Sequence, residues 1–262
     1  MTEPRSPGSL ERCGTKAPAP PRVEGNAETT VEIVLVRHAQ PDWEPGGRAV
    51  DDPELTPLGH EQAARCAAAL SGERFDAFYA SPLARTRATA EPIAQSIGVD
   101  PIFHTWLREI QLPSLQGQTS DQVQEYFAAA RARELTQWWD GLPGGESFRH
   151  FHERIASGVE SLLSDPHRVE IHDDGENRLW RLPPGEPRLL VLAHEGTNAA
   201  LLSHLLGLEP VPWSWMRFSS AWTGISRLRS LHFPSGAVWA VDFFNRTEHL
   251  TTLEAGIGGN SR

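Results

Sequence analysis

The sequence predicts an α/β fold, a three-layer α/β/α sandwich built around a mainly parallel sheet. Short apolar runs of strand length alternate with longer segments that begin at Ser or Thr and end near Gly. This alternation is typical of βαβ units, whose right-handed crossovers make neighbouring strands parallel and place helices over the sheet. The chain has 262 residues, which is enough for one such domain of about 220 residues and a tail.

The first strands and helices are predicted from apolar runs and from the residues at their boundaries. Four apolar runs are predicted as buried strands, at residues 33–36, 75–80, 99–103 and 189–193. Thr56 and Pro57 open the helix after the first strand, because Thr is a good N-cap and Pro is tolerated at the first helical position. By the same reasoning, Ser81 and Pro82 open the helix after the second strand.

Two helices and a hairpin complete the predicted fold. Residues 119–139 and 146–163 have helical patterns and are expected to form a hairpin over the cleft. Near the C-terminus, residues 224–233 and 237–244 flank a turn at Gly236. They predict a β-hairpin at one edge of the sheet.

The predicted domain covers residues 31–254, with a tail at each end. Residues 1–30 are rich in Pro, Gly, Glu, Arg and Ala and have little apolar surface to bury, so we expect disorder there. Residues 165–187 interrupt the strand–helix alternation and predict an inserted surface loop or short hairpin. Residues 255–262 are expected to form a flexible C-terminal tail.

Composition narrows the class of protein. The formal net charge of −10 disfavours a general nucleic-acid binder, which needs a basic face. No apolar run approaches the roughly 18 residues of a membrane span, and the N-terminus lacks the apolar core of a signal peptide. Cys13 and Cys66 are too few for a disulfide framework. We therefore expect a cytoplasmic protein without a membrane partner.

Cations and imidazoles follow the predicted strands at the points where they end. Arg37 and His38 come directly after the first strand, and His194 follows the apolar run at 189–193. Arg85 falls in the first turn of a predicted helix, where a cation opposes the helix dipole and where free N–H groups favour an anion. The carboxyl ends of parallel strands meet at one edge of the sheet, so these side chains are expected around one bound anion.

Motifs in a fixed order resemble those of the histidine phosphatase superfamily, in its phosphoglycerate mutase-like branch. They are LVRH, LTPLGHEQA, SPLARTRATA, LREIQLPSLQGQT, GES, LAHEGT and FNRTEHL. Each motif alone is weak, but their order along residues 31–253 is specific. The resemblance implies the phosphoglycerate mutase-like fold.

The resemblance also implies a reaction through a phosphohistidine. His38 would attack the phosphorus of a phosphomonoester, while Arg37, Arg85 and His194 hold the non-bridging oxygens. Glu109 would protonate the leaving oxygen and then activate water, which requires a raised pKa. This scheme uses arginines where other phosphatases use a divalent ion, so no metal and no cofactor are expected. The expected partner is a small phosphorylated substrate.

Three positions at the predicted substrate site depart from the family pattern. Gln40 stands where the family usually has Glu, and Glu44 replaces an Asn often found next to the matching Trp43. Glu195 replaces the Gly that usually follows the second histidine. We expect Gln40 and Glu195 to border the substrate, and the Glu195 carboxylate to point away from phosphate or to select a substrate with a positive group.

Three functions remain open at this point. The preferred one is a metal-independent phosphomonoesterase. The second is a mutase that returns the phosphoryl group to its substrate, although the Arg-His-Tyr-Gly segment of cofactor-dependent phosphoglycerate mutases is missing near Glu109. The third is a non-catalytic phospholigand-binding module. His172, Asp173 and Asp174 are expected to form a solvated acidic loop rather than a metal site, because no further ligand stands at a suitable spacing.

Overall fold

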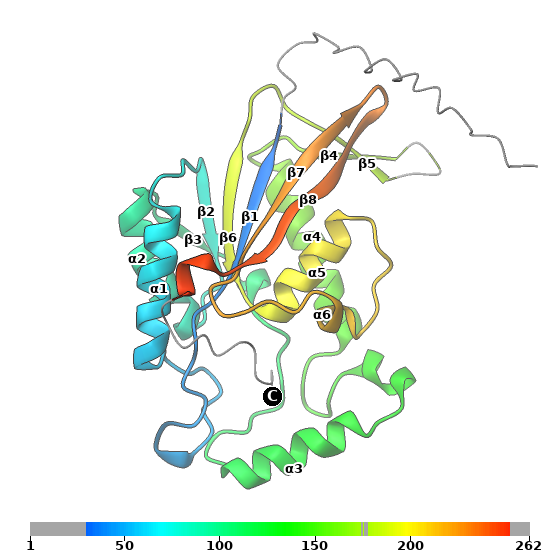
Figure 1. The fold of residues 1–262 in the computed structure, drawn as a ribbon. Helices are drawn as coiled ribbons and strands as arrows, with labels where there is room; N and C mark the ends of the chain where they lie inside the picture. The colour runs from blue at the N-terminus through cyan, green and yellow to red at the C-terminus, as the bar shows by residue number, and fades with distance from the viewer. Residues whose placement is uncertain (1–29, 174, 176–177, 252–262) are drawn as a thin grey trace, which may run out of the picture.

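A mixed sheet of eight strands forms the centre of the molecule in a computed structural model, which describes residues 30–173, 175 and 178–251 (Figure 1). The strand order is β3-β2-β6-β1-β7-β8-β5-β4. The strands are β1 (Glu32–Arg37), β2 (Ala77–Ala80), β3 (Pro101–Phe103), β4 (Glu170–Asp173), β5 (Arg178–Arg181), β6 (Arg188–Ala193), β7 (Ile225–Phe233) and β8 (Gly236–Arg246). Of the predicted tails, residues 1–29 of the N-terminal one (1–30) and the whole C-terminal one (255–262) lie outside the described residues.

The predicted α/β fold is confirmed, with one correction of detail. Parallel pairing joins only β3, β2, β6 and β1, whereas β7, β8, β5 and β4 pair in antiparallel fashion. β4 and β5 are joined by a short link, and so are β7 and β8. Strands joined by a short link pair in antiparallel fashion. The sheet is therefore mixed rather than mainly parallel.

The C-terminal hairpin forms as predicted, but it does not lie at the edge of the sheet. β7 pairs with β1 on one side and β8 pairs with β5 on the other. The predicted insertion forms the short hairpin β4–β5 and joins β8 through the pair Trp180 and Ala237. Because the Trp180 side chain is buried, this added hairpin takes part in the core and becomes the edge.

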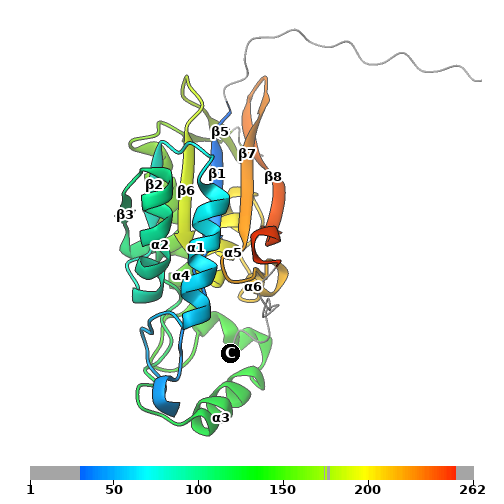
Figure 2. The ribbon, with the colours of Figure 1, turned by 60° about the vertical axis from the view of Figure 1, so that its left-hand side comes forward.

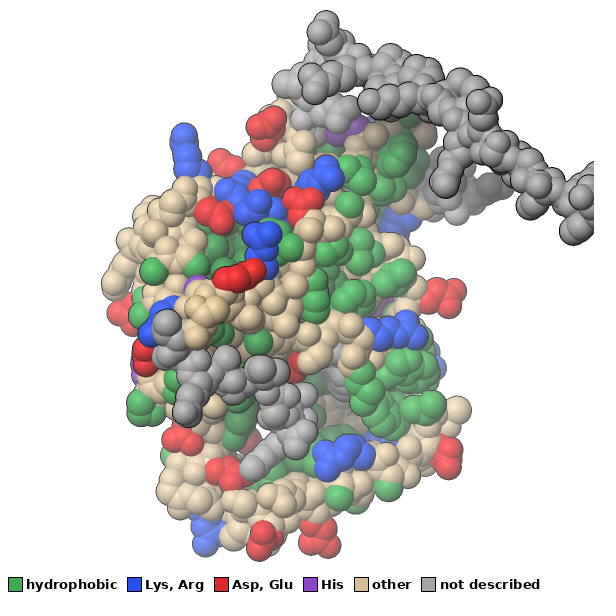
Figure 3. All heavy atoms as spheres, viewed as in Figure 1, with side chains coloured by type: hydrophobic (Ala, Val, Ile, Leu, Met, Phe, Trp, Pro, Cys, Tyr) green, Lys and Arg blue, Asp and Glu red, His purple; other side chains and the backbone are tan. Residues whose placement is uncertain are grey.

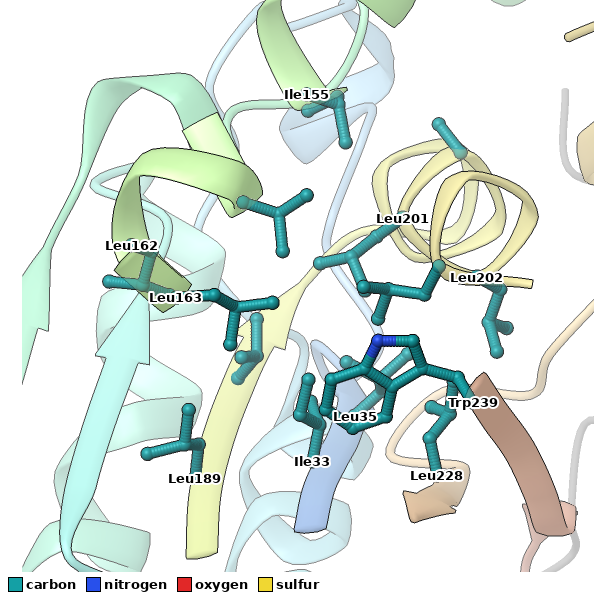
Figure 4. Packing of buried hydrophobic residues seen from close by; sticks show 14 of the residues in the cluster. Ile33, Leu35, Ile155, Leu162, Leu163, Leu189, Leu201, Leu202, Leu228 and Trp239 are labelled. Carbon is teal, nitrogen blue, oxygen red and sulfur yellow. The ribbon is translucent and has the colours of Figure 1, made fainter. Parts of the chain in front are cut away.

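Helices cover both faces of the sheet, as Figures 1 and 2 show. Alternate residues of β1 point into the two layers. Ile33 and Leu35 lie in the larger core cluster, with residues of α4 and α5. Val34 and Val36 lie in the second cluster, with residues of α1 and α2. Figure 4 shows the larger cluster. The α-helices are α1 (Pro57–Leu70), α2 (Ala84–Ile97), α3 (Ser120–Arg131), α4 (Phe148–Ser164), α5 (Glu195–Leu205) and α6 (Ser214–Arg217). Short 3-10 helices occur at η1 (Pro45–Gly47), η2 (Thr105–Leu107), η3 (Leu135–Asp140) and η4 (Glu248–Leu250).

Helix α1 begins as the sequence predicts. The Thr56 hydroxyl accepts a hydrogen bond from the Gly59 N–H at 2.9 Å, and Pro57 is the first helical residue. A Cβ at Gly59 would lie 2.2 Å from the Gln40 carbonyl oxygen, so glycine is required where α1 meets the loop after β1. This close contact fixes α1 against the loop that follows His38.

Helix α2 begins at Ala84, later than predicted, because Ser81 does not cap it. The Ser81 hydroxyl lies 2.8 Å from His194 Nε2, and Leu83 is the N-cap residue. An oxygen of Asp52 accepts from the Ala84 N–H at 3.0 Å instead. A carboxylate from a distant loop thus stabilises this helix end, which favours negative charge.

The predicted helical hairpin over the cleft is only partly formed. α3 stops at Arg131 and continues after a break as η3, whose first turn has its own capping box between Glu134 and Gln137. α4 packs on the sheet and buries apolar side chains at helical spacing, among them Ile155 and Leu163. In Figure 1, α3 lies beyond the carboxyl ends of the parallel strands, and the surface is hollowed beside it (Figure 3). In the described part of the chain, no helix is long and apolar enough to cross a membrane.

Candidate active site

The ends of two neighbouring parallel strands bring the predicted residues together. Arg37 ends β1 and pairs with Ala193 at the end of β6, so His38 and His194 follow on adjacent strands. The two imidazole rings lie 5.0 Å apart between centroids. Arg85, the second residue of α2, reaches the same point, because its Nε donates to His38 Nε2 at 3.3 Å. The charge of Arg37 acts on both His38 and Arg85, so the four side chains surround one point.

The hydrogen bonds of His38 define its tautomer. Its Nδ1 lies 2.7 Å from the Ala39 carbonyl oxygen, which can only accept, so Nδ1 carries the proton. Nε2 then keeps its lone pair, and it accepts from Arg85. Burial lowers the pKa of His38 well below 6.5, and Arg85 and Arg37 lower it further. His38 is therefore a neutral imidazole at pH 7, and its Nε2 has an unprotonated electron pair that accepts from Arg85.

His194 is fully buried and has one unused nitrogen. Its Nε2 lies 2.8 Å from the Ser81 hydroxyl, whereas Nδ1 has no hydrogen-bond partner among the described residues. Burial, followed by the charges of Arg85 and His38, lowers the pKa of His194 well below 6.5. A buried nitrogen without a partner is costly, which indicates a group that a ligand satisfies.

The two arginines are each held by a carboxylate and an indole. Arg37 Nη1 lies 3.1 Å from Glu195 Oε2 and also donates to a backbone carbonyl, and the guanidinium lies 5.9 Å from the Trp222 ring centroid. Arg85 Nη1 lies 3.4 Å from Asp52 Oδ1, and its guanidinium lies 4.9 Å from the ring of Trp43. Burial lowers the pKa of Arg85 to about 10, so it remains charged at pH 7.

Glu109 contacts the first turn of α5. Its Oε2 accepts from the Gly196 N–H at 2.9 Å, and its Oε1 accepts from the Ile110 N–H at 3.0 Å and from the Thr197 hydroxyl at 3.3 Å. Burial raises the pKa of Glu109 above 4.5, although these backbone N–H groups and then Arg85 oppose the rise. The raised pKa is the property that a general acid needs.

Two of the three departures from the family pattern, Gln40 and Glu195, were expected to border the substrate, and both are held by protein groups. Gln40 Oε1 accepts from the Thr56 hydroxyl at 2.8 Å, at the start of α1. Glu195 uses both oxygens, one on Arg37 and the other on the Ser219 hydroxyl at 2.7 Å. The expected role of both residues in substrate binding stays a prediction.

Sequence reasoning missed the residues that hold the site in place. These are Ser81 on His194, Thr197 on Glu109, Asp52 on Arg85, and Thr89, whose hydroxyl accepts from the Ala39 N–H. Ser81 stands out in the sequence directly after a predicted strand, but a serine there also fits a helix N-cap, and that was the role predicted for it. The contact of Asp52 with Arg85 joins residues 33 positions apart, and no local pattern predicts such a pair.

A metal ion has no obvious ligands within residues 30–173, 175 and 178–251. Groups of three or more His, Cys, Asp or Glu side chains that could hold one are absent from this part of the chain. The acidic stretch after His172 includes Asp174, which lies outside the described residues.

Comparison with known proteins identifies the family. The model of the histidine phosphatase superfamily (branch 1) matches residues 33–233. A 2-carboxy-D-arabinitol-1-phosphatase from Triticum aestivum is 34% identical over 204 residues, which are 76% of this chain but only 36% of that protein. A probable phosphoglycerate mutase GpmB from Escherichia coli O1:K1 / APEC is 30% identical over 226 residues, 84% of this chain and 95% of that protein.

A solved structure agrees with this assignment. The mycobacterial glucosyl-3-phosphoglycerate phosphatase superposes with a TM-score of 0.61 at 28% identity, covering 83% of this chain and 100% of that one. The family match includes β6, β1 from Ile33 onward, and the segments that carry His38, Arg85, Glu109 and His194. The chain therefore belongs to the histidine phosphatase superfamily, branch 1.

Proposed function

We propose that the protein is a phosphomonoesterase that hydrolyses a small phosphorylated metabolite through a phosphohistidine on His38. The observation that carries the proposal is the state of His38. It is a buried neutral imidazole whose Nε2 electron pair faces Arg85, in a site where Arg37 and His194 also have unsatisfied nitrogens. A nucleophile surrounded by fixed cations suits phosphoryl transfer, which depends mainly on positioning and charge stabilisation.

The first step forms a covalent intermediate. The electron pair of His38 Nε2 attacks phosphorus, and the bond between phosphorus and the ester oxygen breaks. Glu109, whose protonated form burial favours by raising its pKa, gives its proton to the leaving oxygen, so an alcohol departs. Arg37 and Arg85 offset the negative charge on the non-bridging oxygens, and the unpartnered His194 nitrogen faces the same group.

The second step returns the enzyme to its starting state. The Glu109 carboxylate accepts a proton from water, whose oxygen attacks phosphorus as the nitrogen–phosphorus bond breaks. The electron pair returns to His38 Nε2, and inorganic phosphate leaves. Because Nδ1 stays bonded to the Ala39 carbonyl, the same nitrogen is available for the next cycle.

A phosphoglycerate mutase-type transfer is the second candidate, since the GpmB relative has that probable function. The chemistry at His38 would be the same, but the phosphoryl group would pass to a second hydroxyl instead of water. The chain lacks the Arg-His-Tyr-Gly segment of cofactor-dependent phosphoglycerate mutases near Glu109, and this favours hydrolysis. The two relatives named as phosphatases support the same choice.

A phosphate-release screen tests the proposal. The purified protein is incubated with a panel of phosphomonoesters that includes phosphoglycerates, glucosyl-3-phosphoglycerate and 2-carboxyarabinitol 1-phosphate, with His38→Ala as the control. Phosphate release by the wild type alone supports a phosphatase. Isomerisation of phosphoglycerate without release of phosphate would support the mutase, and no turnover with retained phosphate binding would support a non-catalytic module.

A further inference from the structure

The two site arginines are held by carboxylates that the proposed mechanism does not use. Asp52 is the weaker partner, because its side chain is 47% exposed and lies 3.4 Å from Arg85 Nη1. The Glu195 side chain is 11% exposed and lies 3.1 Å from Arg37 Nη1. Glu195 therefore has the better defined contact, and it does not belong to the set of residues that react.

The contacts of Glu195 leave it no free oxygen. Oε2 is on Arg37 Nη1, and Oε1 accepts from the Ser219 hydroxyl at 2.7 Å. The neighbouring Ser220 carbonyl also accepts from Arg37 Nη1. A carboxylate that is nearly buried and bonded at both oxygens is poorly placed to bind a positive group of a substrate. Its contacts instead fix the Nη1 end of the Arg37 guanidinium.

The opposite edge of the same guanidinium is unused. Arg37 Nε is buried and has no hydrogen-bond partner in the described part of the chain. Nη2, which lies on the same edge as the Nε–H, has no hydrogen bond within that part either. Two parallel N–H groups on one edge match two oxygens of a phosphoryl group, which is the geometry of a bidentate arginine contact.

We propose that Glu195 is a positioning residue that turns the Nε–Nη2 edge of Arg37 toward the phosphoryl group. This inference rests on the proposed function and deepens it. The Glu195 carboxylate lowers the positive charge of the phosphate site, so any gain in rate must come from the fixed orientation of Arg37. Small misplacements in a reacting site cost large factors in rate. Glu195 is also the first residue of α5, where an acid stabilises a helix, so a purely structural role is the alternative.

Two substitutions separate these roles. Glu195→Ala removes the contact with Arg37 and is expected to lower kcat on an aryl phosphate by up to about 10²-fold, since a misplaced group in a reacting site costs a factor of that size. Glu195→Gln keeps an oxygen that accepts from Arg37, so kcat stays near the wild-type value, while loss of the charge lowers the Ki of inorganic phosphate. Both variants lose the acid at the helix end, so Tm falls alike in both.

The control is Asp242→Ala, which removes the carboxylate of a pair with Arg229 on β7 and β8, outside the site. It should leave kcat unchanged. An unchanged kcat in Glu195→Ala, or equal losses of kcat in the Gln and Ala variants, would overturn the positioning role. If the wild type has no turnover, the proposed function fails instead. Calorimetry with inorganic phosphate then decides: weaker binding by Glu195→Ala than by Glu195→Gln supports positioning, and equal binding overturns it.

Discussion

Replacing Glu109 by Gln has two separable consequences. Both carboxylate oxygens accept backbone N–H groups, from Gly196 at 2.9 Å and from Ile110 at 3.0 Å. A carboxamide has one oxygen, so its NH2 must face one of these donors and leave it unsatisfied. That loss costs about 1–3 kcal/mol of unfolding free energy, which lowers Tm by several degrees in a chain of this size.

The catalytic consequence depends on the leaving group. Without a proton donor, an alkyl phosphate should lose about 10²- to 10⁴-fold in kcat, the usual contribution of general acid catalysis. A nitrophenyl phosphate has a leaving oxygen that departs without a proton, so its first step should change little. Single-turnover kinetics on both substrates, with Tm measured in parallel, provide the comparison. Equal losses on the two substrates would refute the role of Glu109 as acid.

Three further predictions follow from the same contacts. Arg85→Lys keeps a charge but loses the planar fork that contacts His38 and Asp52, so kcat/KM should fall about 10²- to 10³-fold in steady-state assays; a near wild-type value would contradict this. Leu163→Ala in the larger core cluster should cost about 2–5 kcal/mol in urea unfolding and leave the active-site chemistry intact, whereas a cost below 1 kcal/mol would contradict the packing. Burial lowers the pKa of seven described histidines below 6.5. Below that pH the unfolded chain binds protons at these histidines and the folded protein resists them, so Tm should fall as the pH drops from about 7 to about 5. A constant Tm over that range would argue against this. These histidines are His38, His104, His152, His167, His194, His204 and His249.

The sequence predicted the elements whose signals are local. The apolar runs before His38 and His194 are the central strands, and Thr56 caps α1 as its residue type predicts. The sequence did not predict that β6 lies next to β1. The carboxyl ends of parallel strands share one edge of the sheet, and this rule and the family resemblance together predicted that Arg37, His38, Arg85 and His194 meet at one place.

Features that depend on distant contacts could not be predicted. Ser81 fits a helix cap, but His194 competes for its hydroxyl from a neighbouring strand, so α2 begins later. The inserted hairpin extends the sheet because Trp180 finds a partner in Ala237, 57 positions further along the chain. The contacts of Glu195 with Arg37 and Ser219 likewise join elements that no local pattern connects.

Trapping of the covalent intermediate tests the central claim most directly. The wild type is mixed with an aryl phosphate, quenched in alkali within milliseconds to preserve an acid-labile bond, and digested for mass spectrometry. The account predicts one phosphoryl group on Nε2 of His38, with none in His38→Ala. A phosphoryl group on another residue, or burst kinetics without any modified histidine, would contradict it.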